Sequence, residues 1–375
     1  MAWRYEVRVK DVAGAVVAII DNATIEFTRK VNGVGNHRID LSGASPHAAT
    51  FVLDGQVEVW RRDQAQGIAW YQEYEGFHRT PVWFTTAEGD DRFNGLGVTY
   101  EDLLARRVIL YPKDSAGAAK TGVGETVIKA YVNENAGPGA TFPPRSVVSG
   151  VTPGMTIQAD LGAGATWQGD RAYENLLDVV REIANVTGVD FRVVGVGPAL
   201  FQFRAGDLAT DRTVTGLVPG TGLNGAGNPP IVFALGFGNM IAPTYSLDRR
   251  EEINVVLITG QGMTDDRTII ERTDAAAIVA SPWNRHEAIK NGNQEDTLAG
   301  LQATGDAMLE VLSARQTLDM KVVQTPASLY GRDYFLGDLV TIQYKTVAVN
   351  RQIQEVHITA AEGRETIEIT MGEPP

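Results

Sequence analysis

The chain has 375 residues, of which 43% are hydrophobic and 21% are charged, an ordinary composition for a globular protein of two or three domains. It has no run of 18 apolar residues and no cysteine, which excludes a transmembrane helix, disulfide bonds, thiolate metal sites and thiol nucleophiles. A formal net charge of −13, with basic residues clustered only as isolated arginine pairs, disfavours nucleic-acid binding.

Residues 1–99 are predicted to form short β-strands. Apolar and polar side chains alternate over residues 4–9, which places Tyr5, Val7 and Val9 on one face. Further strand-like runs lie at 16–20, 25–27, 39–41, 56–60 and 68–77. Strands at a spacing of roughly 8–12 residues are typical of an antiparallel barrel or sandwich. We therefore predict an N-terminal β-barrel domain over residues 1–99.

The clearest predicted helix spans residues 170–187. Its apolar residues recur at helical spacing and are Tyr173, Leu176, Leu177, Val180, Ile183 and Ala184. Asp170 is the candidate N-cap, because its carboxylate can accept a hydrogen bond from the first turn. Gly188 is the candidate C-terminal stop, because glycine readily adopts the left-handed conformation that ends helices.

The rest of the middle region mixes helices with strands. Thr99 is a candidate cap for a short helix, and residues 124–132 form a second helical pattern. Residues 190–204 predict a β-hairpin that turns at Gly197-Pro198. We assign residues 100–230 to an α+β middle domain that includes a glycine-rich loop.

The longest predicted loop is the glycine-rich segment 216–230. Part of it superficially resembles a nucleotide-binding glycine loop. No strand–loop–helix pattern surrounds it and no Gly-Lys-Ser/Thr occurs, so the phosphate-binding interpretation is weak. We interpret the segment as a mobile surface loop, with contact to a partner as the alternative.

Strand patterns return in residues 231–375. They predict a second β-barrel domain, interrupted by a helical insertion over about 274–316. Within this insertion, Ser281-Pro282 is a favourable helix start, and residues 297–316 carry the spacing of a long helix.

The last forty residues predict three strands with their turns. The turn Gly337-Asp338 precedes a strand over 339–344, and Gly363 lies in a short hairpin loop. On the strand between them, the buried parity changes after Ile353 and resumes with Val356. Such a slip predicts a β-bulge, which bends a sheet toward closure.

The residues that could carry chemistry form no recognisable site. The five histidines are His37, His47, His78, His286 and His357. No pair of them has metal-ligand spacing, and the sequence lacks both His-Glu-x-x-His and Gly-x-Ser-x-Gly. We therefore favour structural roles for the histidines.

Acidic pairs and aromatic residues leave two further interpretations open. The acidic pairs are Asp90-Asp91, Glu251-Glu252 and Asp265-Asp266, which could serve glycoside hydrolysis but are more often solvated turns. The aromatic residues are Trp60, Trp70, Tyr71, Tyr74, Phe77 and Trp83, which could stack on carbohydrate, although a barrel core or a subunit interface is favoured. We predict no catalytic, cofactor-binding or metal-binding residues, no cofactor, and no enzymatic activity.

Taken in order, several motifs along nearly the whole chain carry a family resemblance. They are Ile25–Gly35, Val57–Asp63, Tyr74–Phe77, Tyr100–Arg107, Asn175–Leu177, Asp190-Phe191, Gly238–Met240, Gly260–Gly262, Ser281–Glu287 and Tyr330–Val340. With these motifs the chain resembles the tail-hub, or minor tail, proteins of long-tailed bacteriophages, specifically the hub-like family of siphophages.

The resemblance implies a mainly β fold with α+β insertions and a structural role. By resemblance, such hubs are homotrimers in which each subunit has two tube-type antiparallel β-barrel domains, so that three subunits form a pseudo-sixfold ring. The ring would adapt a sixfold tail tube to threefold tip components and line the DNA exit channel. Expected partners are the tail tube or distal tail protein and the tip, fibre or tape-measure proteins, while viral DNA would pass through the lumen without specific binding.

The expected location is the tail tip of the virion. The first ten residues lack the apolar segment of a secretion signal, so we expect synthesis in the host cytoplasm. Two other classes of function are a tail-associated cell-wall hydrolase, which needs two facing carboxylates or a metal, and a carbohydrate-binding adhesin, which would use the aromatic residues or the glycine-rich loop.

Overall fold

A computed structural model gives the structure of the chain. It describes residues 3–111, 115, 117–141, 148–149, 152–206, 208–260, 267–280, 283, 285–291, 298–313, 315–361 and 363–374. These residues divide into two compact units, the first made of residues 1–240 and 322–375 and the second of residues 241–321. No helix in the described ranges is long and apolar enough to cross a membrane.

The first unit is built on one sheet of twelve strands. The strands are β1 (Trp3–Lys10), β2 (Val16–Ile20), β3 (Thr24–Lys30), β4 (Asn36–Ser42), β5 (Gln56–Asp63), β6 (Ile68–Thr85), β7 (Asp91–Thr99), β15 (Asp211–Arg212), β16 (Val232–Ala234), β22 (Leu339–Tyr344), β23 (Val347–Ala361) and β24 (Arg364–Gly372). Their order is β15-β22-β23-β3-β4-β7-β6-β5-β1-β2, with β16 also paired to β22 and β24 to β23. β15 and β16 run parallel to β22, whereas the central pairs are antiparallel.

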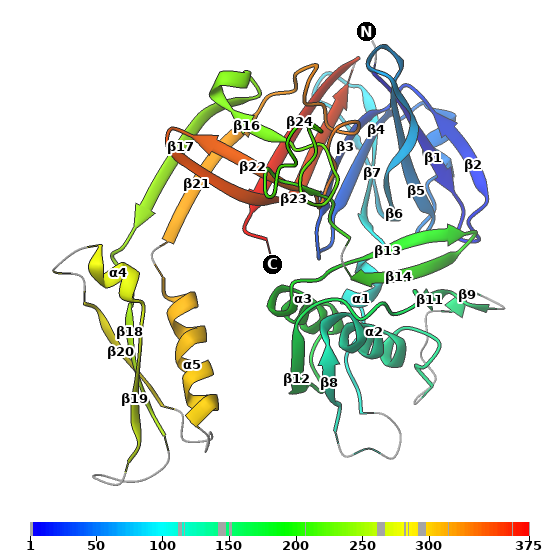
Figure 1. Cartoon of the computed structure of the whole chain (residues 1–375). Helices are drawn as coiled ribbons and strands as arrows, with labels where there is room; N and C mark the ends of the chain where they lie inside the picture. The colour runs from blue at the N-terminus through cyan, green and yellow to red at the C-terminus, as the bar shows by residue number, and fades with distance from the viewer. Residues whose placement is uncertain are drawn as a thin grey trace. The chain divides into compact units, whose positions relative to one another are not determined.

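Strands from the two ends of the chain meet in this sheet (Figure 1). β3 pairs with β23, which places Phe27 opposite Ile358, and both side chains are completely buried. Burying side chains of this size stabilises a fold by about 1.5–3 kcal/mol each. The prediction of a mainly β chain is therefore confirmed, while the division into three domains at residues 99 and 230 stays a prediction.

The C-terminal strands follow the predicted pattern. β22 begins after the turn at Gly337, whose φ is 95°, and the hairpin glycine Gly363 has a φ of 76°. The pairing of β23 with β24 shifts register between Ile353 and Glu355, where the sequence predicts a bulge. The glycine and bulge predictions for this segment are confirmed.

A smaller α+β region lies beside the large sheet and belongs to the same unit. Its elements are α1 (Asp102–Ala105), β8 (Ala119–Val123), α2 (Gly124–Asn135), β9 (Val148–Ser149), β10 (Thr152–Pro153), β11 (Met155–Ile157), β12 (Thr166–Asp170), α3 (Leu176–Thr187), β13 (Asp190–Gly197) and β14 (Leu200–Gly206). β11, β14 and β13 form a three-stranded sheet in that order, and β12 pairs with β8. Helices α2 and α3 share a continuous apolar core with this sheet. We call this region, residues 100–206, the α+β module.

The start of α3 differs from the sequence prediction. The helix begins at Leu176, and Asn175 is its N-cap, accepting hydrogen bonds from the backbone N–H of Leu177 at 3.0 Å and of Asp178 at 3.4 Å. Asp170 is instead the last residue of β12, and its carboxylate accepts from the N–H of Ala118 at 2.8 Å. The prediction of Asp170 as the cap was wrong, because strand pairing with β8 takes that residue out of the helix.

The other helices predicted in this module are present, but some of their ends and caps differ from the prediction. Gly188 ends α3 in the left-handed conformation as predicted, and α2 extends past the predicted end to Asn135. Thr99 does not cap α1; it is the last residue of β7, and its hydroxyl accepts from the N–H of Gly35 at 2.9 Å. The hairpin predicted over 190–204 is formed by β13 and β14.

The second unit combines strands with two helices. They are β17 (Met240–Asp248), β18 (Val255–Thr259), β19 (Ile269–Thr273), α4 (Ala275–Val279), β20 (Glu287–Asn291), α5 (Leu298–Val311) and β21 (Arg315–Val322). The first unit also contains three short 3₁₀ helices, which are η1 (Pro46–Thr50), η2 (Gln64–Gln66) and η3 (Leu235–Phe237). β18 lies between β19 and β20, and Val256, Ile258 and Leu301 form the buried core between this sheet and α5. The predicted helix over 297–316 is thus shorter, because Arg315 begins β21. The predicted helix start Ser281-Pro282 lies outside the described residues.

The cap of α3 gives a test of the fold. Asn175→Ala removes the acceptor for Leu177 and Asp178 and also the donor to the carbonyl of Ala105 at 2.7 Å. We expect the free energy of unfolding, measured by urea denaturation, to fall by about 1–3 kcal/mol. Asn175→Asp keeps the capping acceptor, so its loss should be smaller. Equal losses in the two variants would contradict the capping role.

Candidate functional site

The edge of β13 is held by side chains rather than by another strand. β13 ends its three-stranded sheet, so the N–H groups of alternate residues point away from β14. Three of them, on Phe191, Val193 and Gly195, donate to side-chain oxygens of the large sheet and its connections. The acceptors are Asn32 Oδ1 at 2.7 Å, Glu101 Oε1 at 3.0 Å and Glu75 Oε2 at 3.0 Å.

Each acceptor reaches β13 from a different part of the chain. Asn32 lies in the turn between β3 and β4 with a φ of 53°, a left-handed conformation that asparagine tolerates better than most residues. Its amide nitrogen also donates to Asp190 Oδ1 at 3.2 Å. Glu75 projects from β6, and Glu101 follows β7 directly. These bonds fasten the α+β module to the large sheet.

Burial changes the acidity of both glutamates. It raises the pKa of Glu75 to about 7, although the N–H of Gly195 offsets part of that rise. Burial also raises the pKa of Glu101, against the opposing effect of hydrogen bonds from the Thr99 hydroxyl and the Val193 N–H. Near neutral pH, the Glu75 carboxyl is therefore a mixture of the protonated and ionised forms.

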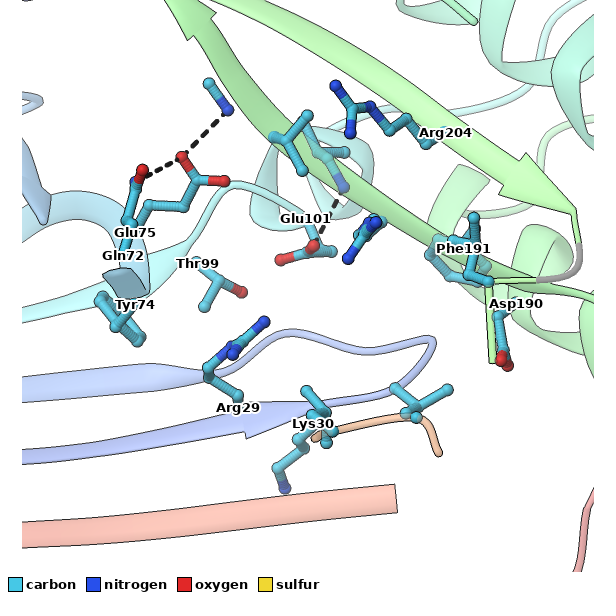
Figure 2. A pocket seen from close by; sticks show the side chains of 18 of the residues that line it. Arg29, Lys30, Gln72, Tyr74, Glu75, Thr99, Glu101, Asp190, Phe191 and Arg204 are labelled. Atoms are coloured by element: carbon cyan, nitrogen blue, oxygen red, sulfur yellow. Dashed lines mark hydrogen bonds between the residues drawn. The ribbon is translucent and has the colours of Figure 1, made fainter. Parts of the chain in front are cut away.

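A cavity of about 330 Å³ lies at this junction (Figure 2). Its walls come from the end of β3, from β6, from β13 and from the segment around Gly337. Four cationic side chains line it, and they are Arg29, Lys30, Arg192 and Arg204. The acidic lining residues are Glu73, Glu75, Glu101 and Asp190. We call this cavity the β13 pocket.

Behind the pocket, Glu73 is the centre of a buried hydrogen-bond network. The side chain is almost completely buried and accepts from Arg29 at 2.9 Å and from the Tyr330 hydroxyl at 2.7 Å. The hydroxyl of Tyr71 also donates to it. Burial, with the nearby charge of Glu73, raises the pKa of Tyr330 well above its ordinary value. Glu73 thus has a structural role, with its side chain engaged by several donors.

Arg61 extends this network toward the C-terminal strands. It is completely buried and donates to Glu365 of β24 at 2.7 Å and to the Tyr71 hydroxyl at 2.7 Å. The hydroxyl of Tyr5 donates to the same Glu365 oxygen. Removing one partner of such a buried pair typically costs about 3–5 kcal/mol, because the other charge remains buried. The network therefore links β1, β5 and β6 to β24 within the first unit.

The structure places the five histidines apart from any shared metal site. His37 Nδ1 lies 3.0 Å from the Tyr74 hydroxyl, and His357 Nδ1 lies 2.9 Å from the Thr28 hydroxyl. His78 is completely buried, its ring 5.3 Å from that of Phe51. Within the described ranges, no group of three or more acidic or histidine side chains could hold a metal ion.

The two acidic pairs within the described residues do not face each other across a cleft. Asp91 accepts from the Thr85 hydroxyl at 2.7 Å in the exposed turn between β6 and β7. Glu251 is exposed, whereas Glu252 is buried and paired with Arg249 at 2.6 Å. The pair Asp265-Asp266 lies outside the described residues.

The aromatic residues singled out in the sequence do not form one platform. Tyr74 and Phe77 are buried in the core. Trp60 lies under the Arg8 guanidinium, 4.2 Å from it, whereas Trp83 packs on Phe93 with ring centroids 4.8 Å apart. Trp70 lies near Arg62, at 4.7 Å, and Tyr71 belongs to the buried network. Their division between core and surface favours structural roles.

The glycine-rich loop is organised around Asn224. The side chain is completely buried, and its amide nitrogen donates to the carbonyls of Asp211 at 2.9 Å and Thr213 at 3.1 Å. Its oxygen accepts from the N–H groups of Ala226 at 3.1 Å and Asn228 at 2.9 Å. These bonds tie the loop to β15, a restraint that the prediction of a mobile loop did not include.

Sequence reasoning did not identify the residues that hold β13. Asn32, Glu75, Glu101 and Asp190 each lie inside one of the motifs that carry the family resemblance, which was the available signal. Without that signal, polar residues at such positions indicate solvent-exposed turns or the solvent-exposed face of a strand.

The sequence of the chain matches the model of a known protein family over almost its whole length. A family described as Siphovirus ReqiPepy6 Gp37-like protein matches residues 6–373. No curated protein matches the chain in a sequence comparison.

Three solved structures share the fold. The 43 kDa tail protein of prophage MuSo2 from Shewanella oneidensis has a TM-score of 0.57 and 11% identity, over 100% of this chain and 99% of that one. The tail protein from Neisseria meningitidis MC58 has a TM-score of 0.55 and 12% identity, covering 100% and 97% of the two chains. Prophage tail protein gp18 from Listeria monocytogenes EGD-e has a TM-score of 0.54 and 10% identity, covering 98% and 94%.

The buried imidazole of His78 should make stability depend on pH. Within the described structure neither of its ring nitrogens has a hydrogen-bond partner, and burial lowers the pKa of His78 to about 4. Because the unfolded chain then binds more protons than the folded one, stability is lost as pH falls from about 6.5 to about 4. We expect His78→Phe to gain about 2–3 kcal/mol relative to the wild type over this interval in urea denaturation. His47→Phe, at a half-buried histidine, is the matched control; an equal gain there would contradict the assignment.

Glu75 should make the stability of the protein depend on pH in the opposite direction, so that stability falls as pH rises. The pKa of Glu75 is about 7 in the folded state and lower in the unfolded state. Its contribution to the free energy of unfolding is therefore present below pH 4.5 and is lost as pH rises to about 7. Glu75→Gln keeps an acceptor for Gly195 but does not ionise. We expect the wild type to lose about 1–2 kcal/mol relative to this variant between pH 4.5 and 7.5, allowing for solvent screening. Glu88→Gln, in the exposed turn between β6 and β7, should show no such trend; a flat profile for both would refute the effect.

Proposed function

Because the chain belongs to the family of Siphovirus ReqiPepy6 Gp37-like proteins, we propose that it is the structural hub of a phage tail tip, adapting a sixfold tail tube to threefold tip components. The coarser role, a structural protein of the phage tail, follows from the family and from the fold that it shares with tail proteins. The observation that carries the hub assignment is that this likeness spans whole chains, including the sheet that joins both chain ends.

A ring-forming subunit needs edges that other chains can cover. β2 ends the large sheet, and its sequence, Val16 to Ile20, contains neither a charge nor a proline. Val16, Val17 and Ile19 expose 49%, 47% and 55% of their surfaces. An apolar edge strand of this kind invites pairing with another chain unless an assembly covers it. This supports a homotrimer in which two tube-type barrels per subunit complete a pseudo-sixfold ring.

The charge of the chain suits a conduit for DNA. With a net charge of −13, phosphate binding is disfavoured on the surfaces of this protein, so DNA could pass through the ring without being held. The proposed neighbours are the tail tube or distal tail protein on one side and tip, fibre or tape-measure proteins on the other. The proposed location is the tail tip of the virion, after synthesis in the host cytoplasm.

No catalytic step is part of this proposal. A cell-wall hydrolase needs a carboxyl group free to exchange protons with a substrate. In the β13 pocket, Glu73 accepts from arginine and tyrosine donors and Glu101 from a backbone donor, so Glu75 has no second free carboxyl group to act with. The dispersed aromatic residues likewise give no support to a carbohydrate-binding adhesin.

The edge of β2 provides the test of assembly. We expect the chain, alone or with purified tail-tube protein, to form a species of three copies in sedimentation velocity experiments. Ile19→Lys places a charge on the edge and should shift this species to the monomer, with an unfolding free energy within about 0.5 kcal/mol of the wild type because Ile19 is exposed.

Val311→Lys, at an exposed position of α5, is the matched control and should leave the trimer intact. A closed dimer, or a trimer that Ile19→Lys does not affect, would contradict the proposal.

A further inference from the structure

Two arginines lie directly opposite each other on the face of the β13–β14 hairpin that borders the β13 pocket. The register pairs Arg192 with Arg204, and both line the cavity. Directly opposed residues of an antiparallel pair have Cβ atoms about 4.5–5.5 Å apart, so the two positive charges repel each other. Arg192 is exposed to solvent, and partial desolvation, with the like charges of Arg204 and Arg29, lowers its pKa.

The carboxylates of the pocket are occupied by other donors. Asp190 accepts from Asn32 and from Gln352, the latter at 2.8 Å. Glu73 is paired with Arg29, and Glu101 accepts from the N–H of Val193. Glu75 accepts from the N–H of Gly195 and from the Gln72 amide, each at 3.0 Å.

The other cation at the rim, Lys30, is paired with Glu355 at 3.0 Å. In the described part of the chain, neither Arg192 nor Arg204 has a carboxylate within 4.0 Å; Arg204 donates instead to Gln202 at 2.8 Å. The pocket thus contains an arginine pair that no carboxylate contacts directly, while Glu75 and Glu101 act on Arg192 only at longer range.

We propose that the β13 pocket binds a carboxylate group, held between Arg192 and Arg204. A guanidinium presents its N–H donors in a planar fork that matches the two oxygens of a carboxylate, and two adjacent forks can bind both oxygens. The cavity of about 330 Å³ admits a short acidic side chain or a small organic acid, whereas a nucleic-acid duplex cannot enter it.

The surrounding charge selects against more highly charged ligands. A phosphate dianion would lie close to Glu73, Glu101 and Asp190, and like charges at such distances repel. A single carboxylate adds only one negative charge and neutralises the opposed arginines. The carboxylate can come from a free small acid or from an acidic side chain of another protein, and both sources use the same chemistry.

Titration of the intact chain with sodium propionate, which carries a single carboxylate, followed by isothermal calorimetry at constant ionic strength, tests the proposal. We expect millimolar binding by the wild type and binding at least tenfold weaker by the double variant Arg192→Gln/Arg204→Gln. The control Arg92→Gln/Arg364→Gln removes two exposed positive charges elsewhere and should bind like the wild type. Equal binding by both double variants, or no binding by the wild type, would overturn the proposal.

Two further measurements make the result specific. Without ligand, Arg204→Gln alone should be at least as stable as the wild type in thermal denaturation, because it relieves the repulsion across the hairpin. If the double glutamine variant does not fold, Arg192→Lys/Arg204→Lys keeps both charges but loses the planar forks, and its propionate affinity should still fall.

A peptide containing glutamate, compared with its glutamine counterpart, separates the two sources. Glutamate-dependent binding tighter than that of propionate assigns the site to a partner protein, whereas binding equal to that of propionate assigns it to a small acid.

Discussion

The arrangement of the first unit depends on how the backbone N–H groups along the open edge of β13 find hydrogen-bond acceptors. Phe191, Val193 and Gly195 present N–H groups that no neighbouring strand receives. The first two donors are buried, and leaving a buried donor unpaired costs about 1–3 kcal/mol. Side chains from the large sheet supply the acceptors, so this edge is at once closed to other strands and fastened to the sheet. The β13 pocket exists because this contact is made by long side chains rather than by a backbone ladder.

A second constraint joins the two ends of the chain. The ladder between β3 and β23 can form only when distant segments meet, and the Arg61–Glu365 pair beside it spans 304 residues. Contacts of such long sequence separation are slow to form, because loop closure must precede any gain from pairing. Once formed, they make the N- and C-terminal strands one folding unit, and β2, at one edge of that sheet, is available to other chains.

Local features of the fold could be predicted from the sequence, whereas distant pairings could not. Alternation predicts β1 and β24, Gly188 predicts the end of α3, and the parity change after Ile353 predicts the bulge. Asp170 and Asn175 are both good caps by type, and only the pairing of β12 with β8 decides between them. The acceptors of the β13 edge were missed for the same reason: a glutamate in a strand shows its role only when the strand it meets is known.

Side chains of the large sheet and its connections hold the edge of β13 as firmly as a neighbouring strand would. Native-state hydrogen exchange, measured by NMR, tests it at the individual amides of Phe191, Val193 and Gly195. The account predicts that these three amides exchange with free energies close to those of the β3–β23 ladder, because opening the edge requires separating the α+β module from the sheet. Rapid exchange of the three amides while the β3–β23 amides stay protected would contradict it.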